Sequence, residues 1–154
     1  MELGENSAIR HPKYASETNS YDFLVLELEQ ASSFSPIALA KADDSDIAGG
    51  GNVTAMGWGA TSQGGNLPTE LLRIDVPLVN NTACAKVLDI DNSMLCAGEG
   101  LHMDACQCDS GGPLITEQSS EDVLIGVVAE TMGVDVPDTS AFMLESPSRL
   151  AKHK

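Results

Sequence analysis

Short apolar runs, each closed by Gly, Pro, Asn, Asp or Ser, recur along the whole chain and constrain its fold more than any other feature. Each run is shorter than ten residues, and no helical period continues for more than one turn between them. This pattern predicts an all-β fold. Only Ser146, followed by Pro147, indicates a short helix, over 146–154. The expected strands are Phe23–Leu28, Ile37–Leu39, Val53–Trp58, Leu71–Val79, Val123–Ala129 and Ala141–Leu144.

The charge balance argues against two classes of partner. The chain carries 8 Lys and Arg against 23 Asp and Glu, a formal net charge of −15, so it has few cations to cluster against nucleic acid or an anionic membrane. The longest wholly apolar stretch, Val123–Ala129, is far shorter than the roughly 20 residues that span a bilayer. Residues Met1–Glu5 lack the basic and apolar regions of a signal peptide. We expect one domain, with no spanning segment and no secretion signal in the printed sequence.

The segment Asp109–Leu114 carries the clearest chemical motif. Its sequence, Asp-Ser-Gly-Gly-Pro-Leu, resembles the nucleophile loop of the trypsin/chymotrypsin serine proteases. The resemblance extends from about Leu3 to Gly126 and implies a trypsin-like double β-barrel. Four other segments follow the order of that family: His11–Tyr14, Tyr21–Leu26, Gly57–Gly59 and Met94–Gly98.

The resemblance implies a role for four residues. Ser110 resembles the nucleophile, and Asp22 resembles the carboxylate that orients a catalytic histidine. The backbone N–H groups of Cys108 and Ser110 would form the oxyanion hole, although the family carries Gly where Cys108 stands. Asp104 occupies the place of the carboxylate at the base of the specificity pocket, which implies cleavage after Lys or Arg.

The catalytic histidine is missing from its expected place. In the triad the histidine precedes the aspartate by about 45 residues, whereas only 21 residues precede Asp22. His11 belongs to a segment that lies on the surface in the family, so we expect it to be solvated. Neither His102 nor His153 stands where the family places its base. We therefore interpret the chain as a truncated, degenerate member that is catalytically incompetent.

The resemblance also predicts how the chain is divided. The predicted parts are a remnant of the first barrel (1–30), a connection (31–46), a nearly complete second barrel (47–145) and a C-terminal helix or tail (146–154). Because most of the first barrel would be absent, we expect an exposed apolar flank around Phe23–Leu28.

In active members Asp109 pairs with an amino terminus freed by cleavage. No Ile-Val-Gly-Gly sequence exists here, so we expect Asp109 to be a buried charge without its partner.

The four cysteines divide into two pairs. Cys84 and Cys96 match a disulfide of the family, whereas the expected partner of Cys106 is absent. Cys106 and Cys108 would therefore be unpaired or joined in a strained ring across one residue. Their spacing does not suit a zinc site that would also use Cys96 and His102, so we expect no metal, and no cofactor is indicated.

Two functions remain open from the sequence. The family implies a serine endopeptidase, here inactive; the alternative is a non-catalytic, secreted protease homologue that binds and inhibits a protein. The partner is accordingly a polypeptide substrate or another protein, and the family implies an extracellular location. The sequence leaves open whether the truncation is a real feature of the protein or an error in locating the start of its gene. Asn52-Val53-Thr54 and Asn80-Asn81-Thr82 match the N-glycosylation pattern, which matters only in a secretory pathway.

Overall fold

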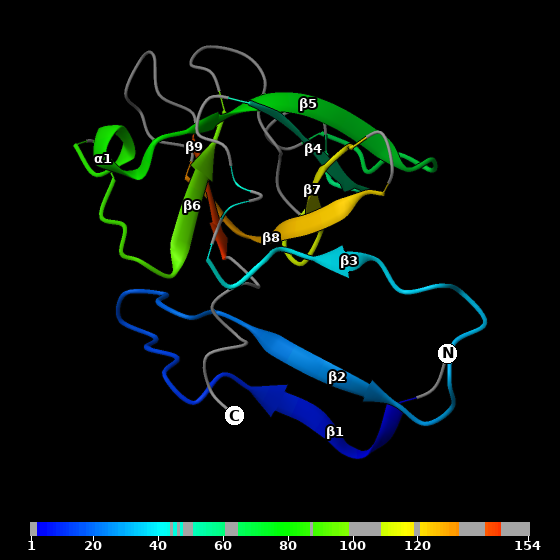
Figure 1. Cartoon of the computed structure of the whole chain (residues 1–154). Coiled ribbons are helices and arrows are strands. Elements are labelled where there is room, and N and C mark those ends of the chain that lie inside the picture. The colour runs from blue at the N-terminus through cyan, green and yellow to red at the C-terminus, as the bar shows by residue number, and fades with distance from the viewer. Residues whose placement is uncertain are drawn as a thin grey trace.

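The computed structural model describes residues 3–43, 45, 47, 51–60, 65–86, 88–98, 109–118, 121–132 and 141–145. These residues form nine strands and one four-residue helix (Figure 1), which confirms the predicted all-β class. The helix expected over 146–154 lies outside the described residues. The strands are β1 (Leu3–Arg10), β2 (Leu24–Leu28), β3 (Ala38–Leu39), β4 (Asn52–Gly57), β5 (Leu72–Val79), β6 (Met94–Ala97), β7 (Pro113–Thr116), β8 (Val123–Met132) and β9 (Ala141–Glu145), and the helix is α1 (Asn81–Cys84).

Six strands pair in a closed cycle and make a barrel. The strand order is β3-β8-β7-β4-β5-β6-β9, and β9 also pairs with β8. All pairs within the cycle are antiparallel. The short strand β3 joins β8 in parallel through Ala38 and Leu39. This barrel corresponds to the second barrel of the expected double-barrel fold, while the predicted residue boundaries between the parts stay a prediction.

Aliphatic side chains fill the barrel, as the low aromatic content of 4% requires. Strand β5 shows the underlying alternation, since Val76 and Leu78 are buried while Asp75 is exposed and Pro77 is half-buried. The alternation directs one face of each strand toward the same interior. The buried cluster consists of Ala40, Val53, Ala55, Val76, Leu78, Leu95, Ala97, Leu114, Val123, Ile125 and Val128.

Strands β1 and β2 form a separate two-stranded antiparallel sheet, which lies below the barrel in Figure 1. Apolar side chains of this sheet face solvent: Ile9 is 58% exposed, Leu24 57% and Leu26 46%. Phe23, just before β2, is buried. The apolar flank expected around Phe23–Leu28 is therefore present, because two strands alone cannot cover both of their faces.

Candidate functional site

The tight turn over Asp109–Gly112 presents the predicted nucleophile. Gly111 has φ +85°, a conformation that favours glycine, and its N–H donates to the Val128 carbonyl at 2.7 Å. A Cβ on Gly112 would lie 2.7 Å from the Met56 carbonyl oxygen. Gly111 is thus required by its positive φ, and Gly112 by the close approach of the Met56 backbone. The hydrogen bond to Val128 holds the turn against β8.

Ser110 lies at the exposed tip of this turn. Its hydroxyl donates to the Ala129 carbonyl at 3.5 Å, a long and weak hydrogen bond. Within the described residues no histidine contacts this hydroxyl; His102 and His153 lie outside them. Among the described residues, the partner of the Ser110 hydroxyl is a backbone carbonyl. A carbonyl oxygen can accept a hydrogen bond but cannot take the proton from serine.

Asp109 differs from its prediction. The side chain is half-buried, and its Oδ1 accepts a hydrogen bond of 2.7 Å from the Gly59 backbone N–H. A Cβ on Gly57 or on Gly59 would overlap the Asp109 carboxylate. The expectation of a buried charge was wrong, because the side chain is half-buried and accepts a backbone hydrogen bond from the Gly-Trp-Gly segment that folds around it. The expected lack of an amino-terminal partner stays a prediction.

Asp22, the predicted orienting carboxylate, is exposed in the turn that precedes β2. The neighbouring Tyr21 has φ +55°, unusual for an aromatic residue, and its backbone N–H donates to Ser93 Oγ at 3.1 Å. Ser93 is fully buried at the barrel, so this bond attaches the turn to the barrel. No hydrogen bond or ion pair within the described residues joins Asp22 to Ser110. Their catalytic roles stay predictions.

His11 is buried, at 7% exposure, and the expectation that it is solvated was wrong. Its ring stacks on the Tyr21 ring with 4.8 Å between centroids and 8° between planes. Its Nδ1 accepts from the Lys13 backbone N–H at 3.2 Å. The turn between β1 and β2 brings the two rings together, so His11 acts in packing the turn.

The disulfide Cys84–Cys96 is present, as the resemblance implied, with 6.4 Å between the Cα atoms. Both residues are buried and pack with Leu88, Val79 and Ile90 in a second, smaller cluster. The bridge therefore joins α1 to β6. Asp104, Cys106 and Cys108 lie outside the described residues, so the predicted specificity pocket and oxyanion hole stay predictions.

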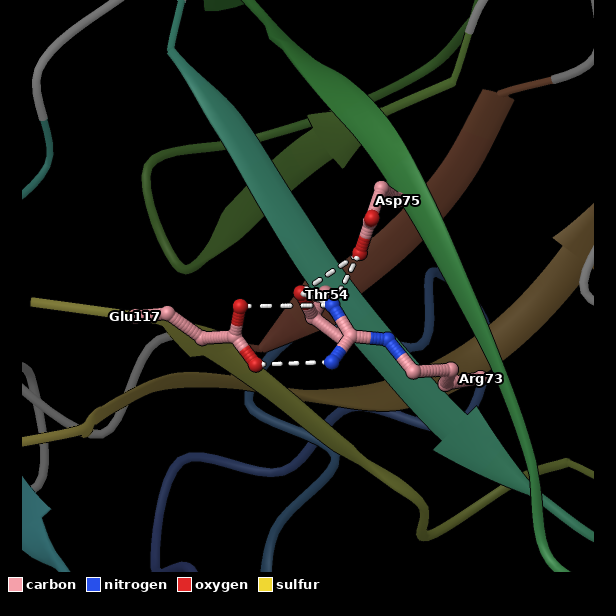
Figure 2. A network of polar contacts seen from close by, with 4 residues as sticks. All are labelled: Thr54, Arg73, Asp75 and Glu117. Atoms are coloured by element: carbon pink, nitrogen blue, oxygen red, sulfur yellow. Dashed lines mark hydrogen bonds and ion pairs between the residues drawn. The ribbon is translucent and has the colours of Figure 1, made fainter.

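A polar network across three neighbouring strands was not anticipated from the sequence (Figure 2). Arg73 on β5 forms ion pairs with Asp75 at 2.7 Å and with Glu117, just after β7, at 2.9 Å. Thr54 on β4 donates to Asp75 at 2.8 Å and accepts from Arg73 at 3.2 Å. Arg73 and Asp75 stand two residues apart on one face of β5, a spacing that could have signalled the pair.

We expect Arg73→Gln to lower the melting temperature slightly at neutral pH. Hydrogen bonds from Arg73, and then from Thr54, hold the pKa of Asp75 below its usual range. A depressed pKa stabilises the fold above the unfolded-state pKa of about 4, and this contribution disappears as the pH falls through the lower folded-state value. Thermal melts from pH 7 to pH 2 should therefore show the difference from wild type shrinking at acid pH.

Arg10→Gln is the matched control, because Arg10 lies over the Tyr14 ring and has no carboxylate partner within the described residues. High salt should also shrink the Arg73 effect, since this network is half-exposed. An equal loss in both variants, or a loss independent of salt, would contradict the network's electrostatic role.

The described residues carry neither a metal-binding cluster nor a membrane-spanning helix. No group of three or more His, Cys, Asp or Glu in that part of the chain is arranged to hold a metal ion. No helix among the same residues has the length and apolar character needed to cross a bilayer.

Comparison with known proteins decides the family. The family model described as Trypsin matches residues 3–147, nearly the whole chain. The chain belongs to the trypsin family. A closed six-stranded barrel with a Ser-Gly-Gly turn pinned against β8 is consistent with this membership.

Several curated relatives of this trypsin-family chain are about 40% identical to it over the aligned residues. Glucanase inhibitor protein 4 of Phytophthora infestans is 39% identical over 127 residues, covering 80% of this chain and 50% of the relative. Serine proteinase stubble of Drosophila melanogaster is 38% identical over 146 residues, covering 86% of this chain and 18% of the relative. Trypsin of Saccharopolyspora erythraea is 39% identical over 123 residues, covering 77% of this chain and 52% of the relative.

The trypsin-family chain spans about half the length of most of the curated relatives it matches. Their names divide between proteinases and inhibitors. Sequence similarity thus assigns the family but does not decide between proteolysis and inhibition.

Proposed function

We propose that this 154-residue trypsin-family chain binds a protein partner without hydrolysing it. The observation that carries this proposal is the hydrogen bond from the Ser110 hydroxyl to the Ala129 carbonyl, with no histidine in contact within the described residues. Serine is a poor nucleophile at neutral pH unless a base accepts its proton. An exposed turn in which no described residue acts as a base is suited to recognition rather than to acyl transfer.

The names of several relatives suggest the class of partner. Glucanase inhibitor proteins of two Phytophthora species are 35–45% identical to this chain. We therefore propose a glucanase as the partner and inhibition as the outcome of binding. The alternative is a serine endopeptidase in which Asp104 selects Lys or Arg, and the first experiment below would reveal it.

Exposed apolar residues on the connection between β4 and β5 are the proposed contact area. Trp58 is 58% exposed, Leu67 59% and Leu71 50%. The hydrogen bond from Gly59 to Asp109 ties this segment to the residue before Ser110. Tryptophan is among the residues that contribute most to binding at protein interfaces. We call Trp58, Leu67 and Leu71 the β4–β5 surface.

We also propose an extracellular location. The Cys84–Cys96 disulfide supports it, because disulfides persist in oxidising compartments and are rare in reducing ones.

The net charge of −15 supports a protein partner rather than nucleic acid or an anionic membrane. Binding then depends on the β4–β5 surface rather than on clustered cations.

We expect no hydrolysis of arginyl or lysyl amide substrates by the purified chain. The measurement is release of a chromophore at neutral pH, with Ser110→Ala as the control. Wild type and control should give the same background rate, because the hydroxyl has no base in the described site. Turnover that is present in wild type and lost in Ser110→Ala would establish the endopeptidase instead.

We expect Trp58→Ala to weaken binding to a susceptible glucanase about 30-fold, since removing a central aromatic residue typically costs about 2 kcal/mol or more. The measurement is calorimetric titration against a panel of purified glucanases, with inhibition assayed in parallel. Phe34→Ala is the matched control, because Phe34 is also an exposed aromatic residue, at 78%, on the connection before β3. Equal losses in both variants would exclude the β4–β5 surface, and no binding by wild type would exclude the glucanase partner.

A further inference from the structure

We propose that Asn80 is an acceptor of an N-linked glycan and is used in preference to Asn52. Both residues begin a glycosylation motif. The folded chain presents the two motifs in opposite ways: the motif at Asn80 is open, and the motif at Asn52 is engaged in the sheet. This inference rests on the extracellular location proposed above, because the glycan donor belongs to the secretory pathway.

The motif Asn80-Asn81-Thr82 lies at the start of α1, where its first and last residues are exposed. Asn80 Oδ1 accepts from the Thr82 backbone N–H at 2.8 Å. Asn80 Nδ2 and the Thr82 hydroxyl make no hydrogen bond to any described residue. The reacting nitrogen and the hydroxyl that defines the motif are therefore both accessible in the folded chain.

Asn81, the middle residue of this motif, differs from its two neighbours in exposure. Asn81 is half-buried, and its Nδ2 donates to the Met94 carbonyl at 2.8 Å. Asn81 thus holds this segment against β6, while Asn80 and Thr82 remain on the outside. Asn81 therefore fixes the position of the motif, and the side chain of Asn80 stays exposed to solvent.

The motif Asn52-Val53-Thr54 lies within β4, which pairs with β5 on one side and β7 on the other. Asn52 itself is exposed, but Val53 is 3% and Thr54 4% exposed. The Thr54 hydroxyl donates to Asp75 and accepts from Arg73, as Figure 2 shows. Recognition of this motif requires β4 to leave both neighbours and break the polar network.

The chemical step at Asn80 is a substitution at a sugar carbon. The donor is a lipid-linked oligosaccharide pyrophosphate. Asn80 Nδ2 forms a bond to the anomeric carbon, the bond from that carbon to the pyrophosphate oxygen breaks, and Nδ2 releases one proton. The lipid pyrophosphate leaves with the bonding electrons. Asn80 Oδ1 takes no part in the new bond, so its hydrogen bond to Thr82 survives.

The experiment is secretion of the full chain, behind a cleavable leader, from a eukaryotic host that carries out N-glycosylation. Intact mass is measured before and after enzymatic release of N-glycans, and peptide mapping locates the Asn converted to Asp. We expect a glycan mass shift that maps to the Asn80 peptide, with the Asn52 peptide mostly unmodified. A shift that maps mainly to Asn52, or no shift in protein recovered from the medium, would overturn the proposal.

Conservative variants separate glycosylation from folding. Asn80→Asp keeps an oxygen that can accept from Thr82 and removes the acceptor nitrogen, so the mass shift should disappear while the melting temperature is retained. Thr82→Val should also lose the shift, and Thr82→Ser should keep it. Asn52→Asp should leave it unchanged. Because neither glucanase binding nor amide hydrolysis enters these readouts, failure here leaves the proposed function intact, and failure of that function leaves this result intact.

Discussion

Leu114→Ala is expected to lower the free energy of unfolding by about 2–5 kcal/mol, the range observed for large-to-small changes in well-packed cores. Leu114 on β7 is fully buried. Its cross-strand neighbours are Ala55 on β4 and Gly126 on β8. Because these neighbours have little or no side chain, they cannot fill the space that the leucine vacates, and a cavity remains in the barrel.

Chemical denaturation followed by circular dichroism measures this loss. Leu67→Ala is the matched control, because Leu67 is 59% exposed and its truncation removes no buried surface of comparable size. We expect the control to change the free energy of unfolding by less than about 0.5 kcal/mol. Similar losses in the two variants would show that Leu114 is not part of a close-packed core.

Replacing both Cys84 and Cys96 by Ala is expected to lower the free energy of unfolding by about 3 kcal/mol. The bridge joins residues separated by 12 positions, so it mainly restricts the unfolded chain. Both cysteines are also buried, which makes their packing with Leu88 part of the loss. Denaturation in oxidising buffer, against wild type, measures the effect.

Reduced wild type provides the control for this prediction, since it lacks the bridge and retains both side chains. Its denaturation midpoint should fall most of the way toward that of the double variant. If reduction left the midpoint of wild type unchanged, the bridge would have no stabilising role, and the loss in the variant would belong to packing alone.

The strands with a regular pattern were predicted closely. For β4 the expectation was Val53–Trp58 and the structure gives Asn52–Gly57; for β5 it was Leu71–Val79 and the structure gives Leu72–Val79. Both strands alternate or run through apolar residues between clear turn signals. Their ends shift by at most one residue, which is within the range by which the ends of such elements vary.

Three strands, β1, β6 and β7, were not predicted as strands. The four residues of β6 are all buried, so no alternation of exposed and buried positions marks them. Strand β7 is equally short and begins at Pro113. Strand β1 carries few apolar residues, and its partner is β2, on the far side of a long turn. In each case the strand is defined by its neighbours in space.

Features of the candidate site could be predicted where they belong to a motif of the family. Contacts between residues far apart in the sequence could not be predicted. The Cys84–Cys96 bridge followed from the motif match. The donor to Asp109 is Gly59, fifty residues away in sequence, and could be found only from the fold. His11 was misplaced for the same reason, because its stacking partner Tyr21 lies across a turn.

The closed cycle of strands also has a consequence for how the chain is expected to fold. The hairpins β4–β5 and β7–β8 are local, but β4 meets β7 through Thr54 and Ile115, whose positions differ by 61. Joining such distant segments requires a large loss of chain entropy before any contact compensates for it. Folding rates of β-proteins fall as such long-range pairings increase. We therefore expect the pairing of β4 with β7 to slow the closure of the barrel, and until it forms, each hairpin keeps an unpaired edge open to other chains.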